Sequence, residues 1–315
     1  MPRIRRLLST AGVLAGALVA AGPALATPTV SGVHIVAHFD ITKGQTPENI
    51  AVEPDGSADI TFALAAQVAR VGTNGRVKIL ARLPTGAGCP LTGAPGVSTG
   101  LVRMPDGTLY AGLCTGSAGT QGVWRIRQDG SAQRFAALPA DGVPNGLAFD
   151  ALRGVFYMAD SYLSTVWRIS LRDGSVTSWA TGPALAPDGS IGANGLKLHD
   201  GAVWVTNTQH GTLLRIPIRP GGAAGAIQQV AYGLPGIDDF AFTGPLPGAQ
   251  VLAAVNSQNE VVLIHRNGTA QVELTAADGL SNPSSVAVRD STVYVDDSAF
   301  LSQRDPNLLL ARLSR

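Results

Sequence analysis

Charged side chains are scarce in this sequence. Its 315 residues include 23 Lys and Arg and 22 Asp and Glu, or 14% charged, whereas soluble proteins have about 25%. Neither sign dominates, so the composition predicts neither a nucleic-acid partner nor binding to an anionic membrane. A helical bundle is also disfavoured, because its solvent-facing helix surfaces need many Lys and Glu residues.

Glycine is abundant instead. The chain holds 38 glycines, and hydrophobic residues make up 45% of it. Such a chain is too apolar and too weakly charged to be disordered. Low charge together with frequent glycine favours many short strands joined by tight turns, which indicates an all-β fold.

Long hydrophobic runs are absent apart from one near the N-terminus. Residues 7–21 are apolar, Arg3, Arg5 and Arg6 precede them, and Ala24-Leu25-Ala26 follows as a small-x-small site. This pattern predicts a secretory signal peptide over residues 1–26, cut near Ala26, and a single domain over residues 27–315. A membrane anchor is the alternative, but glycines interrupt the run and it is short for a span. We expect a secreted protein, extracellular or periplasmic, with no membrane association after cleavage.

Cysteine is nearly absent as well. Cys89 and Cys114 are the only two. In an oxidising compartment one disulfide between them is the favoured interpretation, and two buried thiols are the alternative. No histidine ligands lie near them, so they do not form a zinc site.

One pattern recurs six times along the chain. Each copy starts with a polar residue, continues as a short apolar strand, a turn and a second strand, and ends with a third strand after a loop. We call the first residues of the copies the slot residues; they recur every 44 to 51 residues and are Glu48, Thr99, Asn145, Asn194, Asp238 and Ser284. A period of this size with about four strands per copy predicts a six-bladed β-propeller.

The two ends of the chain predict how the propeller closes. The sixth copy stops after its third strand, residues 307–313, so its fourth strand is missing. A spare strand, residues 33–39, stands before the first copy, in the place that residues 77–83 hold before the second. We expect the N-terminal strand to complete the last blade and remove the open edge. Deleting residues 33–39 should then destabilise the whole molecule.

The slot residues should meet, because the first strand of every propeller blade lines the central axis. All six carry a side-chain oxygen: Glu48 and Asp238 are carboxylates, and Asn145 and Asn194 are amides. Hard oxygen ligands of this kind suit one divalent cation, most simply calcium, whereas zinc and copper prefer His or Cys. The simpler alternative is that each is a turn residue leading into a strand.

The six-fold repeat and the order of four slot residues resemble those of the senescence marker protein/gluconolactonase family, the regucalcin-like lactonases. The resemblance implies a six-bladed propeller hydrolase with one bound calcium or similar ion. It implies the metal ligands Glu48, Asn145, Asn194 and Asp238, with Asp238 also as catalytic base or nucleophile. The adjacent Asp239 leaves an ambiguity of one residue, which the apolar register resolves in favour of Asp238, because Phe240 then matches the apolar residues of the other copies.

Polar residues also end the second strands, on the face where the slot residues lie. They are the pairs Asp160-Ser161, Asn207-Thr208, Asn256-Ser257 and Asp297-Ser298. We expect these residues, with Thr99, Asp239 and Ser284, to contact substrate or to orient the ligands; capping of strand ends is the alternative for the four strand-end residues. His210, in a loop on that face, is a candidate pocket residue and proton shuttle.

The sequence therefore predicts a secreted, monomeric, cation-dependent hydrolase of a small-molecule lactone or related ester. It lacks the G-x-S-x-G motif of serine hydrolases and the G-x-G-x-x-G motif of dinucleotide binding. Two alternatives stay open: a non-catalytic binding or scaffold propeller with a structural cation, and a biosynthetic propeller similar to strictosidine synthase. A quinoprotein sugar dehydrogenase is disfavoured, since it needs His and basic residues around the axis.

Overall fold

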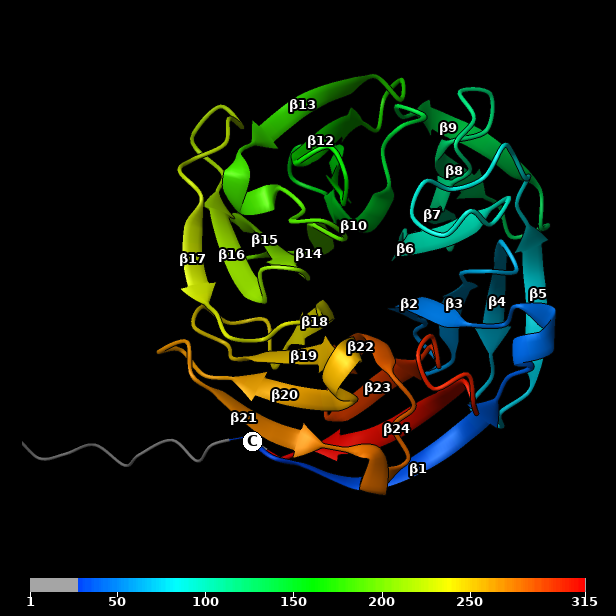
Figure 1. The fold of residues 1–315 in the computed structure, drawn as a ribbon, viewed down its shortest axis with the longest axis vertical. Helices are drawn as coiled ribbons and strands as arrows, with labels where there is room; N and C mark the ends of the chain where they lie inside the picture. The colour runs from blue at the N-terminus through cyan, green and yellow to red at the C-terminus, as the bar shows by residue number, and fades with distance from the viewer. Residues whose placement is uncertain (1–27, 315) are drawn as a thin grey trace, which may run out of the picture.

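Six four-stranded antiparallel sheets stand around a central axis (Figure 1) in the computed structural model, which describes residues 28–314. In blades 1 to 5 the first strand in sequence is innermost, and the others follow outward in chain order. The predicted six-bladed β-propeller is therefore confirmed. The predicted signal peptide lies outside the described residues, among which no helix has the length and apolar character needed to cross a membrane.

The blades have these strands, from the axis outward. Blade 1 holds β2 (Pro47–Val52), β3 (Ala58–Phe62), β4 (Gln67–Val71) and β5 (Val77–Arg82); blade 2 holds β6 (Val97–Arg103), β7 (Leu109–Cys114), β8 (Gly122–Ile126) and β9 (Ala132–Ala137). Blade 3 holds β10 (Pro144–Asp150), β11 (Val155–Asp160), β12 (Thr165–Ser170) and β13 (Val176–Thr181); blade 4 holds β14 (Ala193–His199), β15 (Ala202–Asn207), β16 (Thr212–Pro217) and β17 (Gln228–Ala231). Blade 5 holds β18 (Ile237–Phe242), β19 (Val251–Val255), β20 (Glu260–Ile264) and β21 (Ala270–Leu274); blade 6 holds β22 (Pro283–Arg289), β23 (Thr292–Asp297), β24 (Asn307–Leu313) and, outermost, β1 (Val30–His38).

Short turns with Asp-Gly or Asn-Gly join many neighbouring strands. At the turn between β2 and β3, Asp55 Oδ1 accepts a hydrogen bond from the backbone N–H of Ser57 at 2.9 Å, and Gly56 has φ of 86°. The carboxylate thus closes the turn, and glycine takes the left-handed conformation that other residues disfavour. The same carboxylate-to-backbone bond recurs in the turns at Asp106, Asp129 and Asp173.

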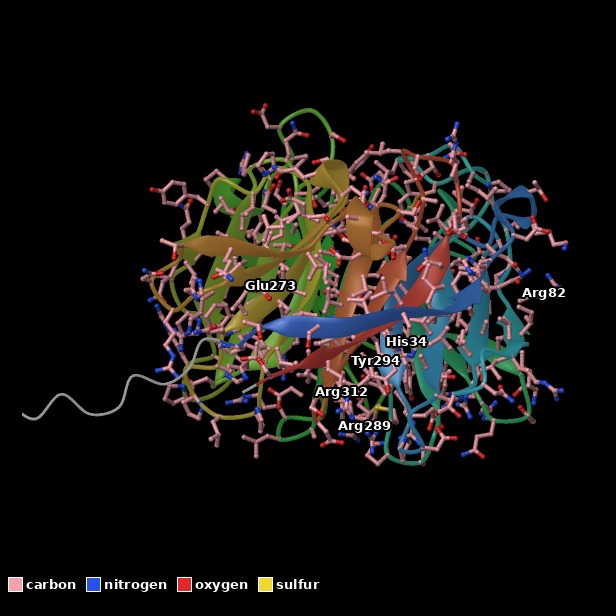
Figure 2. The ribbon with its side chains drawn as sticks, turned by 90° about the horizontal axis from the view of Figure 1, so that it is seen from below. His34, Arg82, Glu273, Arg289, Tyr294 and Arg312 are labelled. Atoms are coloured by element: carbon pink, nitrogen blue, oxygen red, sulfur yellow. A yellow bond between two sulfur atoms is a disulfide. The ribbon has the colours of Figure 1, made fainter. Side chains whose placement is uncertain are left out.

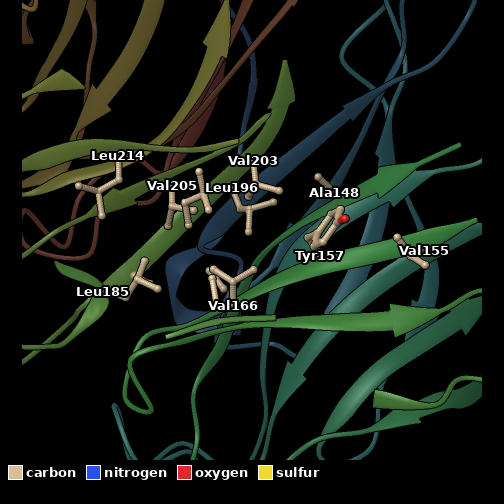
Figure 3. Packing of buried hydrophobic residues seen from close by; sticks show 13 residues of the cluster. Ala148, Val155, Tyr157, Val166, Leu185, Leu196, Val203, Val205 and Leu214 are labelled. Carbon is tan, nitrogen blue, oxygen red and sulfur yellow. The ribbon is translucent and has the colours of Figure 1, made fainter. Parts of the chain in front are cut away.

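Apolar side chains pack between neighbouring blades, and each of the six blade interfaces has its own cluster. Figure 3 shows the cluster between blades 3 and 4, where Tyr157, Leu196 and Val203 are fully buried. Strands covered on both faces need few charged residues, which accounts for the low charge of the sequence.

The N-terminal strand closes the ring as predicted. β1 pairs antiparallel with β24, and Figure 2 shows it lying along that strand on the outside of blade 6. Directly after it, Phe39 is buried and packs edge to face on Phe62 of blade 1, with ring centroids 4.9 Å apart. The first strand therefore contributes to the packing of blade 6 against blade 1.

We expect Phe39→Ala to lower the free energy of unfolding by about 3–5 kcal/mol, the usual loss for removing a buried phenylalanine. The loss should appear as one cooperative transition at lower denaturant concentration, because the residue bridges the two ends of the ring. Urea unfolding followed by circular dichroism measures it. Leu152→Ala, at a position that is 86% exposed, is the control and should change stability by less than about 0.5 kcal/mol. Equal effects of the two substitutions would contradict this account of ring closure.

Candidate functional site

An extra residue interrupts every inner strand at its slot position. In blade 5, Ile237 pairs with Val255 and Phe240 with Ala253, so Asp238 and Asp239 together oppose one residue of β19. The other five inner strands have the same register shift at the same place. A β-bulge of this kind redirects side chains, and here it recurs six times at the N-terminal ends of the inner strands.

Neighbouring inner strands approach closely at the residue after the slot. In blades 2, 3 and 4 this residue is glycine. A Cβ atom at Gly146 would lie 2.4 Å from the backbone nitrogen of Leu196 and 2.5 Å from the carbonyl oxygen of Asn194. Any side chain there would push adjacent strands apart, so this half of the ring depends on glycine.

The other half of the ring has polar side chains at the same position: Asn49, Asp239 and Ser285. Asp239 Oδ2 accepts hydrogen bonds from Asn49 Nδ2 at 2.8 Å and Ser285 Oγ at 2.9 Å, and it forms an ion pair with Lys197. Asp239 thus joins the inner strands of blades 1, 4, 5 and 6. Its carboxylate is occupied in holding the ring together, which leaves Asp238 as the better placed of the two to act on a ligand.

The four residues predicted as metal ligands lie at equivalent positions of the ring. Asn194 Nδ2 donates to Asp238 Oδ1 at 2.8 Å, which joins two of them directly. Glu48, Asn145, Asn194 and Asp238 are all buried and expose between 3% and 8% of their surface. Their placement is what the resemblance implies, whereas their binding of a metal stays a prediction.

The hydroxyl slot residues join blades to each other. Thr99 Oγ1 donates to the carbonyl of Pro144 at 3.0 Å, and Ser284 Oγ donates to the carbonyl of Pro47 at 2.9 Å. Each acceptor is the first residue of the next inner strand, directly before that strand's slot residue. Thr99 and Ser284 therefore hold neighbouring slots in position.

The four polar residues that end the second strands form hydrogen bonds with backbone groups of nearby loops and strand ends. Asp160 Oδ1 accepts from the backbone N–H of Val143, and Asn207 Nδ2 donates to the carbonyl of Ala186. Asp297 Oδ1 accepts from the backbone N–H of Ser281. Asn256 likewise donates through Nδ2 to the carbonyls of Asn282 and Pro283. The structure thus places all four as caps of strand ends and loops.

At two of these strand ends, the second residue of the pair contacts the amide of a slot residue. Ser161 Oγ lies 3.3 Å from Asn145 Nδ2, and Thr208 Oγ1 accepts from Asn194 Nδ2 at 2.8 Å. Ser161 also donates to the carbonyl of Ala193, next to the slot of blade 4. These two hydroxyls orient the amide slots, and their position one residue after each strand end is the signal that marks them.

His210 is not brought to the ring. It lines a shallow surface pocket with Gln229 and Tyr232 at the outer part of blade 4. The other four histidines also lie on the outer strand, at a strand end or in a loop: His34, His38, His199 and His265. No imidazole is therefore placed to exchange protons at the slot residues among the residues that the structure describes.

The predicted disulfide is present and lies near the ring. Cys89 and Cys114 are bonded, and Cys114 ends β7 opposite Val97 at the start of β6. Around the bond lies an apolar cluster that also includes Tyr162 and Phe300, from the loops after β11 and β23. The disulfide thus anchors the loop before β6 beside the slot end of the inner strands.

The surroundings of Glu48 and Asp238 favour the protonated, neutral form of each carboxyl group. Burial raises the pKa of Glu48 well above its usual range, and the carboxylates of Asp238, Asp239 and Asp296 raise it further. Burial and then the Asp239 carboxylate likewise raise the pKa of Asp238, against the hydrogen bond from Asn194. Within residues 28–314, Lys197 is the only basic side chain in an ion pair with these groups. The ring therefore favours an added positive charge.

Asp296 was not among the residues that the sequence pattern indicated. It precedes Asp297 on β23, and the two side chains point to opposite faces of the sheet. Burial, followed by the charges of Asp297 and Asp239, raises the pKa of Asp296 well above its usual range. The sequence shows only two adjacent aspartates, and the register of β23 decides which of them approaches the ring.

The residues present fit a hard cation. No group of three or more His, Cys, Asp or Glu side chains is placed to hold a metal among residues 28–314, so a cation there would also need amide oxygens or water, as calcium accepts. One carboxylate oxygen and one amide oxygen are available: Glu48 Oε2 and Asn194 Oδ1 are buried and have no hydrogen-bond partner in the described part of the chain.

Comparison with solved structures gives many matches of the same fold. Regucalcin from Agrobacterium tumefaciens, described as a calcium-binding protein, matches with a TM-score of 0.63 and 14% identity over 88% of this chain and 93% of its own. A putative gluconolactonase matches with a TM-score of 0.63 and 13% identity over 90% and 92%. The likeness establishes the fold.

A third match is virginiamycin B lyase from Staphylococcus aureus, solved as a catalytically inactive histidine-to-alanine variant with quinupristin. Its TM-score is 0.59 at 16% identity, over 86% of this chain and 82% of its own. A scan against protein-family models gives no match, and a search of curated proteins gives none.

The pKa of Asp297 sets a pH dependence of stability. Burial raises it from 3.8 to about 8. Between these two pKa values the folded protein keeps a proton that the unfolded chain releases. The contribution of protonated Asp297 to the free energy of unfolding is therefore complete below pH 4 and is lost as the pH rises towards 8. In chelator-containing buffer we expect Asp297→Asn to reduce the fall of unfolding free energy with pH, by up to about 1.4 kcal/mol per pH unit. Denaturant unfolding at a series of pH values measures the slope. Asp188→Asn, in an exposed loop, should leave the slope unchanged; an unchanged slope in Asp297→Asn would contradict the prediction.

Proposed function

We propose that the protein is a secreted, divalent-cation-dependent hydrolase that opens a lactone or a related ester of a small molecule. The observation that carries this proposal is the burial of Glu48, Asn145, Asn194 and Asp238 at equivalent positions of the inner strands. Two of their buried oxygens lack a hydrogen-bond partner among the described residues, which supports a role as ligands of a cation, most simply calcium.

When bound, a calcium ion would supply positive charge that polarises the carbonyl group of a lactone or ester. In our proposal Asp238 takes the proton from the attacking water at Oδ2, since Oδ1 already accepts from Asn194. The water oxygen then bonds to the carbonyl carbon, the carbon–oxygen ester bond breaks, and the proton passes on to the leaving alkoxide. Thr208 and Ser161 keep the two amides oriented through this sequence.

The comparisons favour a lactonase over a lyase. The description of regucalcin as a calcium-binding protein agrees with an oxygen-only site, and the second match is described as a putative gluconolactonase. The lyase loses its activity when a histidine is replaced, whereas no histidine lies at the slot residues of this chain in its described part. This difference is the reason we propose a hydrolase rather than a lyase.

One observation favours a second candidate, a non-catalytic propeller with a structural cation. The slot side chains expose at most 8% of their surface, and a substrate must reach them. Cation binding without turnover would support this alternative.

Secretion is part of the proposal. The charged start, apolar run and small-x-small site predict export with cleavage near Ala26, and the disulfide between Cys89 and Cys114 suits an oxidising compartment. We expect the mature protein to act as a monomer on a small-molecule substrate.

The test is a panel of lactones and esters offered to the purified mature protein with calcium and with chelator. We expect turnover only with the cation, and complete loss of turnover and of calcium-induced thermal stabilisation in Glu48→Ala and Asn194→Ala, because each removes a ligand oxygen. Glu260→Gln on β20, the third strand of blade 5 from the axis, is the control and should retain both. Activity that persists without metal would refute the mechanism.

A further inference from the structure

One position on the second strand of each blade faces the next blade. In blade 1, Thr61 of β3 pairs with Asn49, and its Oγ1 donates to the carbonyl of Thr99 in blade 2 at 2.9 Å. In blade 4, Thr206 Oγ1 donates to the carbonyl of Asp238 in blade 5 at 2.6 Å. Each acceptor is the slot residue of the following blade, so in blades 1 and 4 this position donates a hydrogen bond across the blade boundary. Blades 2, 3 and 5 have small residues without a side-chain donor there: Gly112, Ala159 and Ala254.

Asp296 occupies this position in blade 6. It pairs with Ser285 just as Thr61 pairs with Asn49, and the slot residue of the following blade is Glu48. Ser284 Oγ lies 2.9 Å from the carbonyl of Pro47 and 3.3 Å from the carbonyl of Asp296. One hydroxyl thus reaches both strands, which places Asp296 beside the start of β2.

A carboxylate cannot replace the donor that threonine provides. Asp296 is fully buried, and both of its side-chain oxygens lack a hydrogen-bond partner among residues 28–314. Glu48 Oε2, across the same boundary, is buried without a partner too. Ionised carboxylates only accept hydrogen bonds, so neither group can satisfy the other, and their burial is costly unless a proton or a positive charge compensates it.

The other carboxylates near the ring have partners or a separate role. Asp239 is compensated by Lys197, Asn49 and Ser285, and Asp297 accepts from the backbone of Ser281. Asp296 is the one whose two oxygens are both buried without a partner in the described residues. Nothing in the packing of blade 6 explains an aspartate at a place where blades 1 and 4 have threonine.

We propose that Asp296 is a positioning residue of the cation site, whose negative charge behind Glu48 strengthens cation binding at the slot residues. The proposal rests on the proposed function, because it presupposes a cation at the ring. Asp296 acts through Glu48 rather than as a direct ligand, since no three acidic or imidazole side chains in the described chain converge on one point. A bound cation would compensate this charge, which links the closure between blades 6 and 1 to the cation.

The test compares two substitutions at one position with a matched control. Asp296→Asn removes the charge and keeps the shape, and Asp296→Thr restores the residue type of blades 1 and 4. Asp297→Asn is the control, one residue along the same strand and on the opposite face. Calcium affinity is measured by titration calorimetry, and melting temperature is measured with chelator and with calcium.

Both substitutions at Asp296 should weaken calcium binding by about 10- to 100-fold, the usual effect of losing a group that supports a ligand. Without metal, Asp296→Thr should melt at a higher temperature than the wild type, because its hydroxyl can donate to the carbonyl of Glu48. Asp297→Asn should not weaken calcium binding. A residue with a purely structural role would not raise stability and lower affinity together.

The outcomes separate this inference from the proposed function. If the wild type binds calcium and both Asp296 variants bind it equally well, the inference is wrong and the proposed cation site stands. If the wild type binds no calcium, the proposed function and the inference both fail. If Asp297→Asn weakens binding as much as Asp296→Asn does, the effect is not specific to the face towards Glu48, and the inference is overturned.

Discussion

Close packing of six inner strands around one axis is the constraint on which the rest of this structure depends. At Gly100, Gly146 and Gly195 the backbone of the next strand lies so near that a Cβ atom would come within about 2.3 to 2.6 Å of it. Six β-bulges accompany this approach, and each adds one residue at the slot. The same crowding that closes the ring therefore gathers the slot side chains and withdraws them from solvent.

The ring has two unlike halves as a result. Blades 2, 3 and 4 meet through glycine, and blades 1, 5 and 6 meet through the side chains of Asn49, Asp239 and Ser285. The polar half includes the junction of blades 6 and 1, where the chain passes from β1 of the last blade to β2 of the first. Hydrogen bonds to Asp239 reinforce that junction near the axis, and the packing of Phe39 on Phe62 reinforces it farther out.

Buried acidic groups at the site reduce the stability of the folded protein when no cation is bound. Glu48, Asp238 and Asp296 are held out of water, and neighbouring negative charges raise the pKa of each. A protein can tolerate such groups if they are protonated or if a positive charge joins them. The free-energy cost of burying these carboxyl groups is the physical basis for expecting the ring to bind a cation. The disulfide between Cys89 and Cys114 stabilises the adjacent loop.

Features that depend on local spacing were predictable from the sequence. The repeat revealed the blades and the closing strand, Asp-Gly pairs revealed turns such as that at Asp55, and equivalent first positions revealed the slot residues. The strand-end residues were harder, because Asp160 and Asn207 could serve either the ring or their own loops, and only the hydrogen bonds show that they serve loops. His210 was misleading for the same reason, since nearness in sequence to a slot does not specify on which side of a loop a side chain lies.

The sequence by itself determined the number of blades, the way the ring closes and the set of oxygen-bearing side chains at its centre, because these follow from periodicity along the chain. Tertiary structure alone decided which aspartate of the pair Asp296 and Asp297 approaches Glu48, and which of Asp238 and Asp239 is occupied by Lys197. Adjacent residues of the same type are indistinguishable as a pattern. They acquire different chemistry only when the register of one blade sets each against a particular neighbour in the next.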